Sequence, residues 1–282
     1  MNAPPAELRE PDDSPAKPES DASGPRPSEA SRLPGVATLG LGEPIRWLRL
    51  GWQDFRRAPW IGLFFGACFA AMGVAIALAF MRSPQWTLVL CGSFLMLGPF
   101  LAIGLYDVSR KLESGRPPSL GDALTAWDGN LGALVLYLGV LLVLEMLWSR
   151  SALVIFAVSF NTMPAAVNTL ELLLDPENLG FVVTYLGVGA IFAGLIFATS
   201  VVSIPMIMDR DTDGISAGIT SFRVCFTNPL TMFFWGALIT ALVVLAMLPY
   251  FAGLLIIGPV LGHASWHAYR PAVRPAGDAP AA

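Results

Sequence analysis

The feature that most constrains this chain is a set of apolar runs, each about 20 residues long. A helix of that length covers a membrane hydrocarbon core of about 30 Å. The short alternating segments typical of closed membrane barrels do not occur in the sequence. We therefore predict an all-α membrane protein with six transmembrane helices, at residues 60–81, 86–106, 131–148, 181–208, 231–248 and 250–268.

Composition supports this class. Hydrophobic residues make up 55% of the chain and charged residues only 13%, and the mean hydropathy is +0.62. In soluble domains about a quarter of the residues are charged. Residues 1–44 are rich in Pro, Ser, Ala and acidic residues and contain no apolar run, so they cannot bury enough surface to offset chain entropy. We expect disordered tails at 1–44 and 271–282 and a membrane domain at 45–270.

The basic residues predict the orientation of the chain. With six spans and a cytoplasmic N-terminus, only Arg82 and Arg150 of the 17 Lys and Arg residues lie outside, as the positive-inside rule requires. The opposite orientation places all the others outside. We therefore expect both termini in the cytoplasm of a bacterial cell, with the protein in its inner membrane.

Amphipathic helices are predicted beside the spans. Apolar residues recur at helical spacing in 45–57, between arginines that face lipid phosphate. A second surface helix is predicted near 120–127, and a third at 161–177. Between these the apolar pattern continues over 151–160, so the third span is either long and tilted or followed by a piece on the membrane surface. The sequence leaves the course of 149–180 open.

Two recurring residue patterns indicate internal repeats. Gly98-Pro99, followed by Tyr106 and Arg110, recurs as Gly258-Pro259, followed by Trp266 and Arg270. Upstream, residues 52–66 and 222–236 share their aromatic, proline and glycine positions at a constant offset. We predict that spans one and two and spans five and six are duplicated hairpins in parallel orientation, each preceded by an amphipathic helix. The middle pair is at best a degenerate third unit.

Four motifs together resemble a known family. They are residues 47–54 (WLRLGWQD), 98–100 (GPF), 209–211 (DRD) and 262–267 (GHASWH). They are similar to the uncharacterised bacterial integral membrane family called domain of unknown function 2189, over about residues 45–270. The resemblance implies a bacterial inner-membrane location. Some members carry the label of putative cytochrome c oxidase subunit, but the two histidines here are too few for the haem and copper ligands of a catalytic subunit.

His263 and His267 are the most distinctive candidates for a binding site. They lie four residues apart, so both rings project from one face of a helix. No further ligand is nearby in sequence, and we expect no metal and no cofactor. The alternatives are interfacial histidines and a proton-sensitive contact. In the repeat alignment Asp107 and Arg110 match His267 and Arg270, and we predict that Asp107 pairs with His267.

Two further acidic features each allow a functional and a structural interpretation. Glu145 is the only carboxylate inside a predicted span, which makes it either an ion or proton pathway residue or an interfacial group. Residues 209–214 copy the first half of a calcium loop, but Thr220 stands where the bidentate glutamate is required. The alternative is a helix start capped by Asp213.

No catalytic residue set stands out in the sequence, which favours a non-enzymatic protein over an enzyme without deciding between them. The favoured function is that of a non-enzymatic accessory or scaffold protein. Respiratory complexes are one group of proteins with which it could associate. The alternative is a permease for small solutes or lipids, and a lipid-active enzyme comes third. The expected partners are the lipid bilayer and other membrane proteins, with no nucleic acid.

Overall fold

The computed structural model describes residues 34–82, 87–160, 175–210 and 212–274, with the backbone alone at 87–96. Within these ranges the chain is helical, and the only extended pairing is a single bridge between Val36 and Val273. The all-α prediction is confirmed. The surface helix predicted at 161–177 falls almost wholly outside the described residues.

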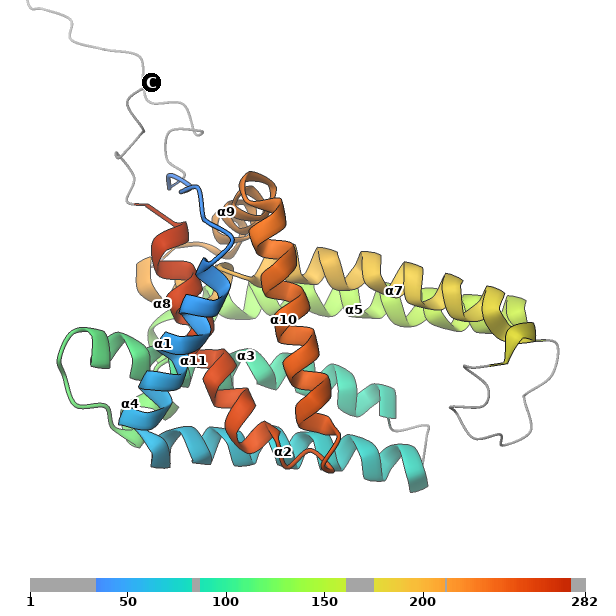
Figure 1. The fold of residues 1–282 in the computed structure, drawn as a ribbon, viewed down its shortest axis with the longest axis horizontal. Coiled ribbons are helices and arrows are strands. Elements are labelled where there is room, and N and C mark those ends of the chain that lie inside the picture. The colour runs from blue at the N-terminus through green and yellow to red at the C-terminus, as the bar shows by residue number, and fades with distance from the viewer. Residues whose placement is uncertain (1–33, 83–86, 161–174, 211, 275–282) are drawn as a thin grey trace, which may run out of the picture. The chain divides into compact units, whose positions relative to one another are not determined.

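The first hairpin follows an amphipathic helix, as predicted. Helix α1 (Glu43–Arg57) is followed by α2 (Pro59–Arg82) and α3 (Thr87–Glu113) (Figure 1). Pro59 occupies the first position of α2, where the missing N–H costs no helical hydrogen bond. Helix α3 continues beyond the predicted end at 106 by seven residues, to Glu113, so Asp107, Arg110 and Lys111 lie on a helix and not in a loop.

The second hairpin settles the course of 149–160. Helix α5 (Leu131–Ser159) is one continuous helix, and it follows the short helices α4 (Leu120–Leu124) and η3 (Asp128–Asn130). After η4 (Pro176–Asn178), the predicted span 181–208 is divided into α7 (Leu179–Ser200) and α8 (Ser203–Arg210). The break precedes Pro205, which cannot donate a helical hydrogen bond.

The third hairpin is preceded by a helix, as predicted for each outer hairpin. Helix α9 (Gly214–Thr227) is capped by Asp213, whose side chain accepts hydrogen bonds from the N–H groups of Ile215 and Ser216. These hydrogen bonds, chiefly those from Ser216, lower the pKa of Asp213. Helices α10 (Pro229–Met247) and α11 (Leu254–Ala272) follow. The turn between them includes Tyr250 and Phe251 at positive φ, so it is longer than a break at Pro249 alone.

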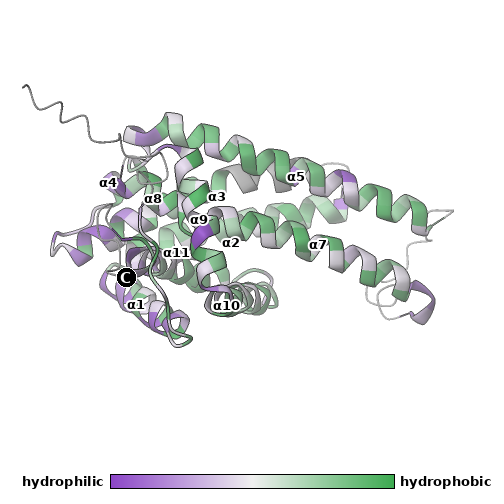
Figure 2. Cartoon of the chain, turned by 90° about the horizontal axis from the view of Figure 1, so that it is seen from above, coloured by the Kyte–Doolittle hydropathy of each residue, from purple (hydrophilic) through white to green (hydrophobic). Residues whose placement is uncertain are grey.

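Four stretches of helix are long and apolar enough to cross a membrane, among the described residues: Pro59–Arg82, Leu120–Ser159, Pro176–Arg210 and Pro229–Met247. Helices α3 and α11, which correspond to the other two predicted spans, are not among them. Figure 2 shows that α5 and α7 are apolar along most of their length, whereas hydrophilic residues gather around α1, α4 and α8.

Packing is organised around α11, which contacts α1, α2, α3 and α10. Gly51 lets α1 lie close to α11, and Gly66 lets α2 approach the backbone of Leu255. Helices α5 and α7 lie side by side (Figure 1). Each short or amphipathic helix rests on a neighbouring hairpin: α4 on α3, α9 on α7 and α8, and α1 on α11.

The segment 34–42 corrects the predicted extent of the N-terminal tail. Its backbone is bound, because the Leu39 N–H donates to Asn228 Oδ1 (2.6 Å) and Asn228 Nδ2 donates to the Ala37 carbonyl (2.9 Å). The Ala37 N–H donates to the Ala272 carbonyl at 3.0 Å. We call residues 34–40 the N-terminal strap. At the other end, α11 continues to Ala272, past the predicted tail start at 271.

Candidate functional site

The ends of α3, α8 and α11 meet in a group of charged and aromatic side chains. Glu113 accepts a hydrogen bond from Trp266 Nε1 (3.1 Å) and lies 3.3 Å from Arg270 Nε. Asp209 accepts the Tyr269 hydroxyl (2.7 Å) and lies 3.5 Å from the Arg270 guanidinium. Arg270 therefore joins a carboxylate of α3 to one of α8.

A pocket of about 450 Å³ lies beside this group and is bounded by α1, α3, α8 and α11. Its walls combine three arginines, two glutamates and one histidine with apolar residues. They are Glu43, Arg46, Trp47, Leu50, Glu113, Arg210, His267, Arg270, Pro271 and Val273. Two of the predicted site residues, His267 and Arg270, line this pocket. It is the candidate functional site of the chain.

His267 is joined to α1, and the predicted pairing with Asp107 is wrong. His267 Nε2 lies 2.8 Å from Asp54 Oδ2, and Asp54 is almost fully buried. Gly51, one turn before Asp54, brings α1 close enough to α11 for this contact. The pair fixes the amphipathic helix to the end of α11.

Asp107 forms ion pairs on its own helix. Its carboxylate lies 2.6 Å from the Arg110 guanidinium and 2.7 Å from Lys111 Nζ. Lys111 also reaches Asp122 of α4, at 2.8 Å. Burial alone lowers the pKa of Lys111, but the hydrogen bonds that Lys111 donates to Asp107 and Asp122 outweigh it and raise that pKa. The hydrogen bond that Asp122 accepts from Lys111, with one involving Ser119, lowers the pKa of Asp122.

His263 lies between α11 and α3 and is fully buried. Its Nδ1 is 2.8 Å from the Ser109 hydroxyl, and its Nε2 has no hydrogen-bond partner among the described residues. The two histidines thus have different neighbours, Ser109 for one and Asp54 for the other. In the part of the chain that the structure describes, no group of three or more His, Cys, Asp or Glu side chains could hold a metal ion.

Arg210 belongs to the site but was missed as a functional candidate. Its guanidinium donates to the Tyr269 hydroxyl (2.7 Å) and to the carbonyls of Val273 (2.7 Å) and Arg274 (3.0 Å). The calcium-loop resemblance around it does not describe the geometry, because Asp209 binds Tyr269 while Asp213 caps α9. The sequence signal was limited to two charges at the end of an apolar run.

Glu145, the predicted intramembrane acid, lies in α5 and is half-buried. No described residue forms a hydrogen bond or ion pair with its carboxylate. It shares a helix face with Leu141 and Trp148, and Trp148 packs against Tyr185 of α7 with ring centroids 5.2 Å apart. The structure therefore places it away from the pocket at the helix ends.

The described residues are almost all helical and include several helices long and apolar enough to cross a membrane, as expected of an integral membrane protein. Residues 87–209 match the family model described as "Predicted integral membrane protein (DUF2189)". The match confirms the family that the sequence motifs indicated, and it covers α3 to α8. No curated protein and no solved structure matches the chain.

Proposed function

We propose that the protein is a non-enzymatic accessory or scaffold protein of the bacterial inner membrane. In this proposal six helices cross the bilayer and both termini are cytoplasmic. Helices α3 and α11 supply the two crossings beyond the four apolar stretches, and at 27 and 19 residues they are long enough to do so. The charged pocket then lies at the cytoplasmic surface.

The observation that carries the proposal is the exposure of the α5–α7 hairpin. Within the described residues 179–200 of α7, no side chain is buried. Val183 and Ile191 of α7 are 62% and 63% exposed, and Val154 of α5 is 62% exposed. The two helices contact each other, and Figure 1 shows the hairpin extending beyond the other helices at one end. In a bilayer, such open helix faces can pack against the helices of another membrane protein.

The charged residues of the candidate site support a structural role. Arg270, His267 and Asp107 each contact an oppositely charged or titratable side chain of the same protein. Arg210 binds the Tyr269 hydroxyl and two backbone carbonyls. These contacts join α1, α4, α8 and α11 to one another and to α3, so they stabilise the arrangement of the helix ends.

Internal duplication is part of the proposal, and the start of each outer hairpin supports it. Ala58, between α1 and α2, has φ −130° and ψ 57°, and Asn228, at the equivalent place between α9 and α10, has φ −128° and ψ 54°. Both N–H groups donate to the carbonyl four residues earlier. We extend the repeat to the middle unit, because α4, α9 and α1 each rest on the last helix of another hairpin.

The permease alternative calls for a polar cavity midway through the membrane. The pockets along the apolar helices are instead lined mainly by hydrocarbon: about 970 Å³ between α7 and α10, and about 580 Å³ between α2, α10 and α11. Such surfaces suit lipid chains or helices better than a hydrophilic solute. The geometry favours the scaffold over the permease.

Native purification in mild detergent, followed by mass spectrometry of the bound proteins, tests the scaffold. We expect one membrane protein in stoichiometric amount, and subunits of respiratory complexes are the first candidates to look for. Ile191→Trp, on the exposed face of α7, should release that partner. Leu78→Trp, at an exposed position of α2, is the matched control and should retain it. A chain that purifies alone, or loses its partner equally in both variants, refutes the proposal.

A further inference from the structure

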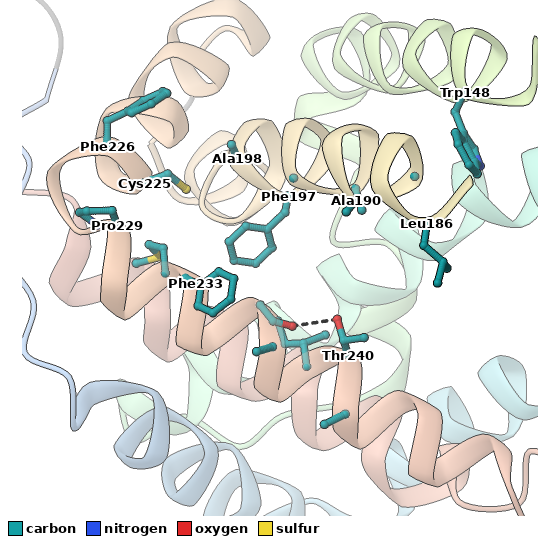
Figure 3. Close-up of a pocket in the computed structure, with 18 of the residues that line it drawn as sticks. Trp148, Leu186, Ala190, Phe197, Ala198, Cys225, Phe226, Pro229, Phe233 and Thr240 are labelled. Atoms are coloured by element: carbon teal, nitrogen blue, oxygen red, sulfur yellow. Dashed lines mark hydrogen bonds between the residues drawn. The ribbon is translucent and has the colours of Figure 1, made fainter. Parts of the chain in front are cut away.

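A groove of about 970 Å³ lies between α7 and α10 and meets α9 at one end. Figure 3 shows the two helices diverging from the α9 end, where Cys225, Phe226 and Pro229 close the groove. Phe197 of α7 and Phe233 of α10 line its narrow part, and Trp148 of α5 lies at the far end. Helices α7 and α10 are therefore separated by a space that is open to the side.

The groove is apolar in its chemistry. Small residues form much of both walls, including Gly194 on α7 and Ala237 on α10. Thr240 carries the hydroxyl group of the α10 wall. Its Oγ1 donates a hydrogen bond to the Gly236 carbonyl of the same helix (2.9 Å), so the hydroxyl is already bound within α10. Both walls belong to stretches that can cross a membrane. In a membrane, lipid hydrocarbon surrounds these walls and can fill the apolar groove without desolvating any polar group.

Size favours a thin occupant over a helix. The lining residues of α7 extend from Tyr185 to Ala198, which is about 20 Å along a helix. A helix with side chains is about 10–12 Å across, so about 970 Å³ holds only about 10 Å of its length. The groove thus has about half the cross-section that a helix of a partner or of a second copy needs. A flexible acyl chain meets that limit.

A cation lies next to the closed end of the groove. Arg223 of α9 is exposed and precedes Phe226, a groove residue, by one helical turn. Its guanidinium donates to the Pro34 carbonyl (3.2 Å), and no described carboxylate pairs with it. Phe226 itself is 78% exposed. The amphipathic α9 therefore places an uncompensated positive charge where a lipid phosphate lies when its acyl chain enters the groove.

We propose that the groove between α7 and α10 binds one phospholipid of the surrounding bilayer, with an acyl chain between the two helices and an anionic headgroup beside Arg223. The site is independent of the scaffold role, because its walls do not include Ile191, the position that tests the scaffold. Loss of the lipid and loss of a protein partner can therefore be observed separately.

Native mass spectrometry of the detergent-purified protein provides the test. The probes are phosphatidylglycerol and phosphatidylcholine with identical acyl chains, each titrated alone. We expect one phosphatidylglycerol to be retained at lower concentration than phosphatidylcholine. Gly194→Leu projects a side chain into the groove, where the added Cβ meets no atom within 4 Å, and should weaken retention of both lipids at least tenfold.

Gly187→Leu is the matched control for the groove. It makes the same change on the same helix, its Cβ also meets no atom within 4 Å, and it does not line the groove, so retention should be unchanged. Ala237→Phe fills the opposite wall and gives a second reading if Gly194→Leu does not fold. Equal retention in Gly194→Leu, Ala237→Phe and the control overturns the proposal. So does a protein dimer that Gly194→Leu dissociates.

Arg223→Gln tests the headgroup contact. It should remove the preference for phosphatidylglycerol and leave retention of phosphatidylcholine unchanged. Arg49→Gln, at an exposed arginine of α1 without an ion pair among the described residues, should keep the preference. If Arg223→Gln and Arg49→Gln reduce the preference equally, the anionic part of the proposal is wrong.

Discussion

Replacement of Gly51 by alanine tests the contact that positions the candidate site. Gly51 faces α11, and a Cβ built on it lies 2.6 Å from the Val260 carbonyl oxygen and 2.7 Å from the Ala264 nitrogen. Both atoms belong to the backbone of α11, so no side chain can rotate away. The two helices must move apart by about 0.7 Å to restore an ordinary carbon–oxygen contact.

The magnitude follows from two opposing effects. A gap of about 0.7 Å forfeits a quarter to a half of the dispersion energy of the atoms that face it, and overpacking of this kind costs about 1–3 kcal/mol. Alanine is more favourable than glycine inside a helix by about 1 kcal/mol. Because the clash is with backbone, we expect the upper part of the range and a net loss of about 1–2 kcal/mol.

The assay is equilibrium unfolding in mixed detergent micelles, followed by tryptophan fluorescence, with amide hydrogen exchange over residues 43–57 as the local measurement. Gly218→Ala in α9 is the control, because its Cβ meets no atom within 4 Å. The control should gain about 1 kcal/mol from helix propensity alone. If Gly51→Ala is as stable as Gly218→Ala, with unchanged exchange in α1, the close approach of α1 to α11 is refuted.

Two further predictions concern single polar side chains. Asn228→Ala removes the hydrogen-bond partner of the Leu39 N–H and of the Ala37 carbonyl. It should lower the free energy of unfolding by about 2–4 kcal/mol and speed hydrogen exchange in the N-terminal strap. Unchanged exchange in the strap contradicts this prediction. Glu145→Leu replaces a half-buried carboxyl that lacks a described partner, so it should raise the free energy of unfolding by about 1–3 kcal/mol, and a loss of stability contradicts it.

The sequence located the helices well, because the length of an apolar run depends on local composition alone. Each predicted span corresponds to a helix within a few residues at its start, and the amphipathic pattern at 45–57 corresponds to α1. The alternative reading of Asp213 as a helix cap is confirmed, because one side chain and the following two N–H groups determine it. The same composition did not show where α7 ends and α8 begins.

The contacts within the site could not be predicted from composition or spacing. Asp54 and His267 are far apart in sequence, and their contact requires that α1 cross α11 at Gly51. The N-terminal strap was expected to be disordered because residues 1–44 contain no long apolar run. Its order depends on hydrogen bonds to its backbone from Asn228 and Thr231, which a hydropathy argument does not detect.

The error over Asp107 follows from the symmetry argument itself. If the outer hairpins are related by rotation about an axis along the membrane normal, as proposed, equivalent residues share a depth but meet only when they lie on the axis. Asp107 and His267 would then each contact the short helix that packs on the hairpin to which that residue belongs. His267 of α11 binds Asp54 of α1, whereas on α3 Asp107 holds Lys111, which binds Asp122 of α4. The two contacts are therefore counterparts: each fixes a shorter helix to the end of a long one, α1 to α11 and α4 to α3.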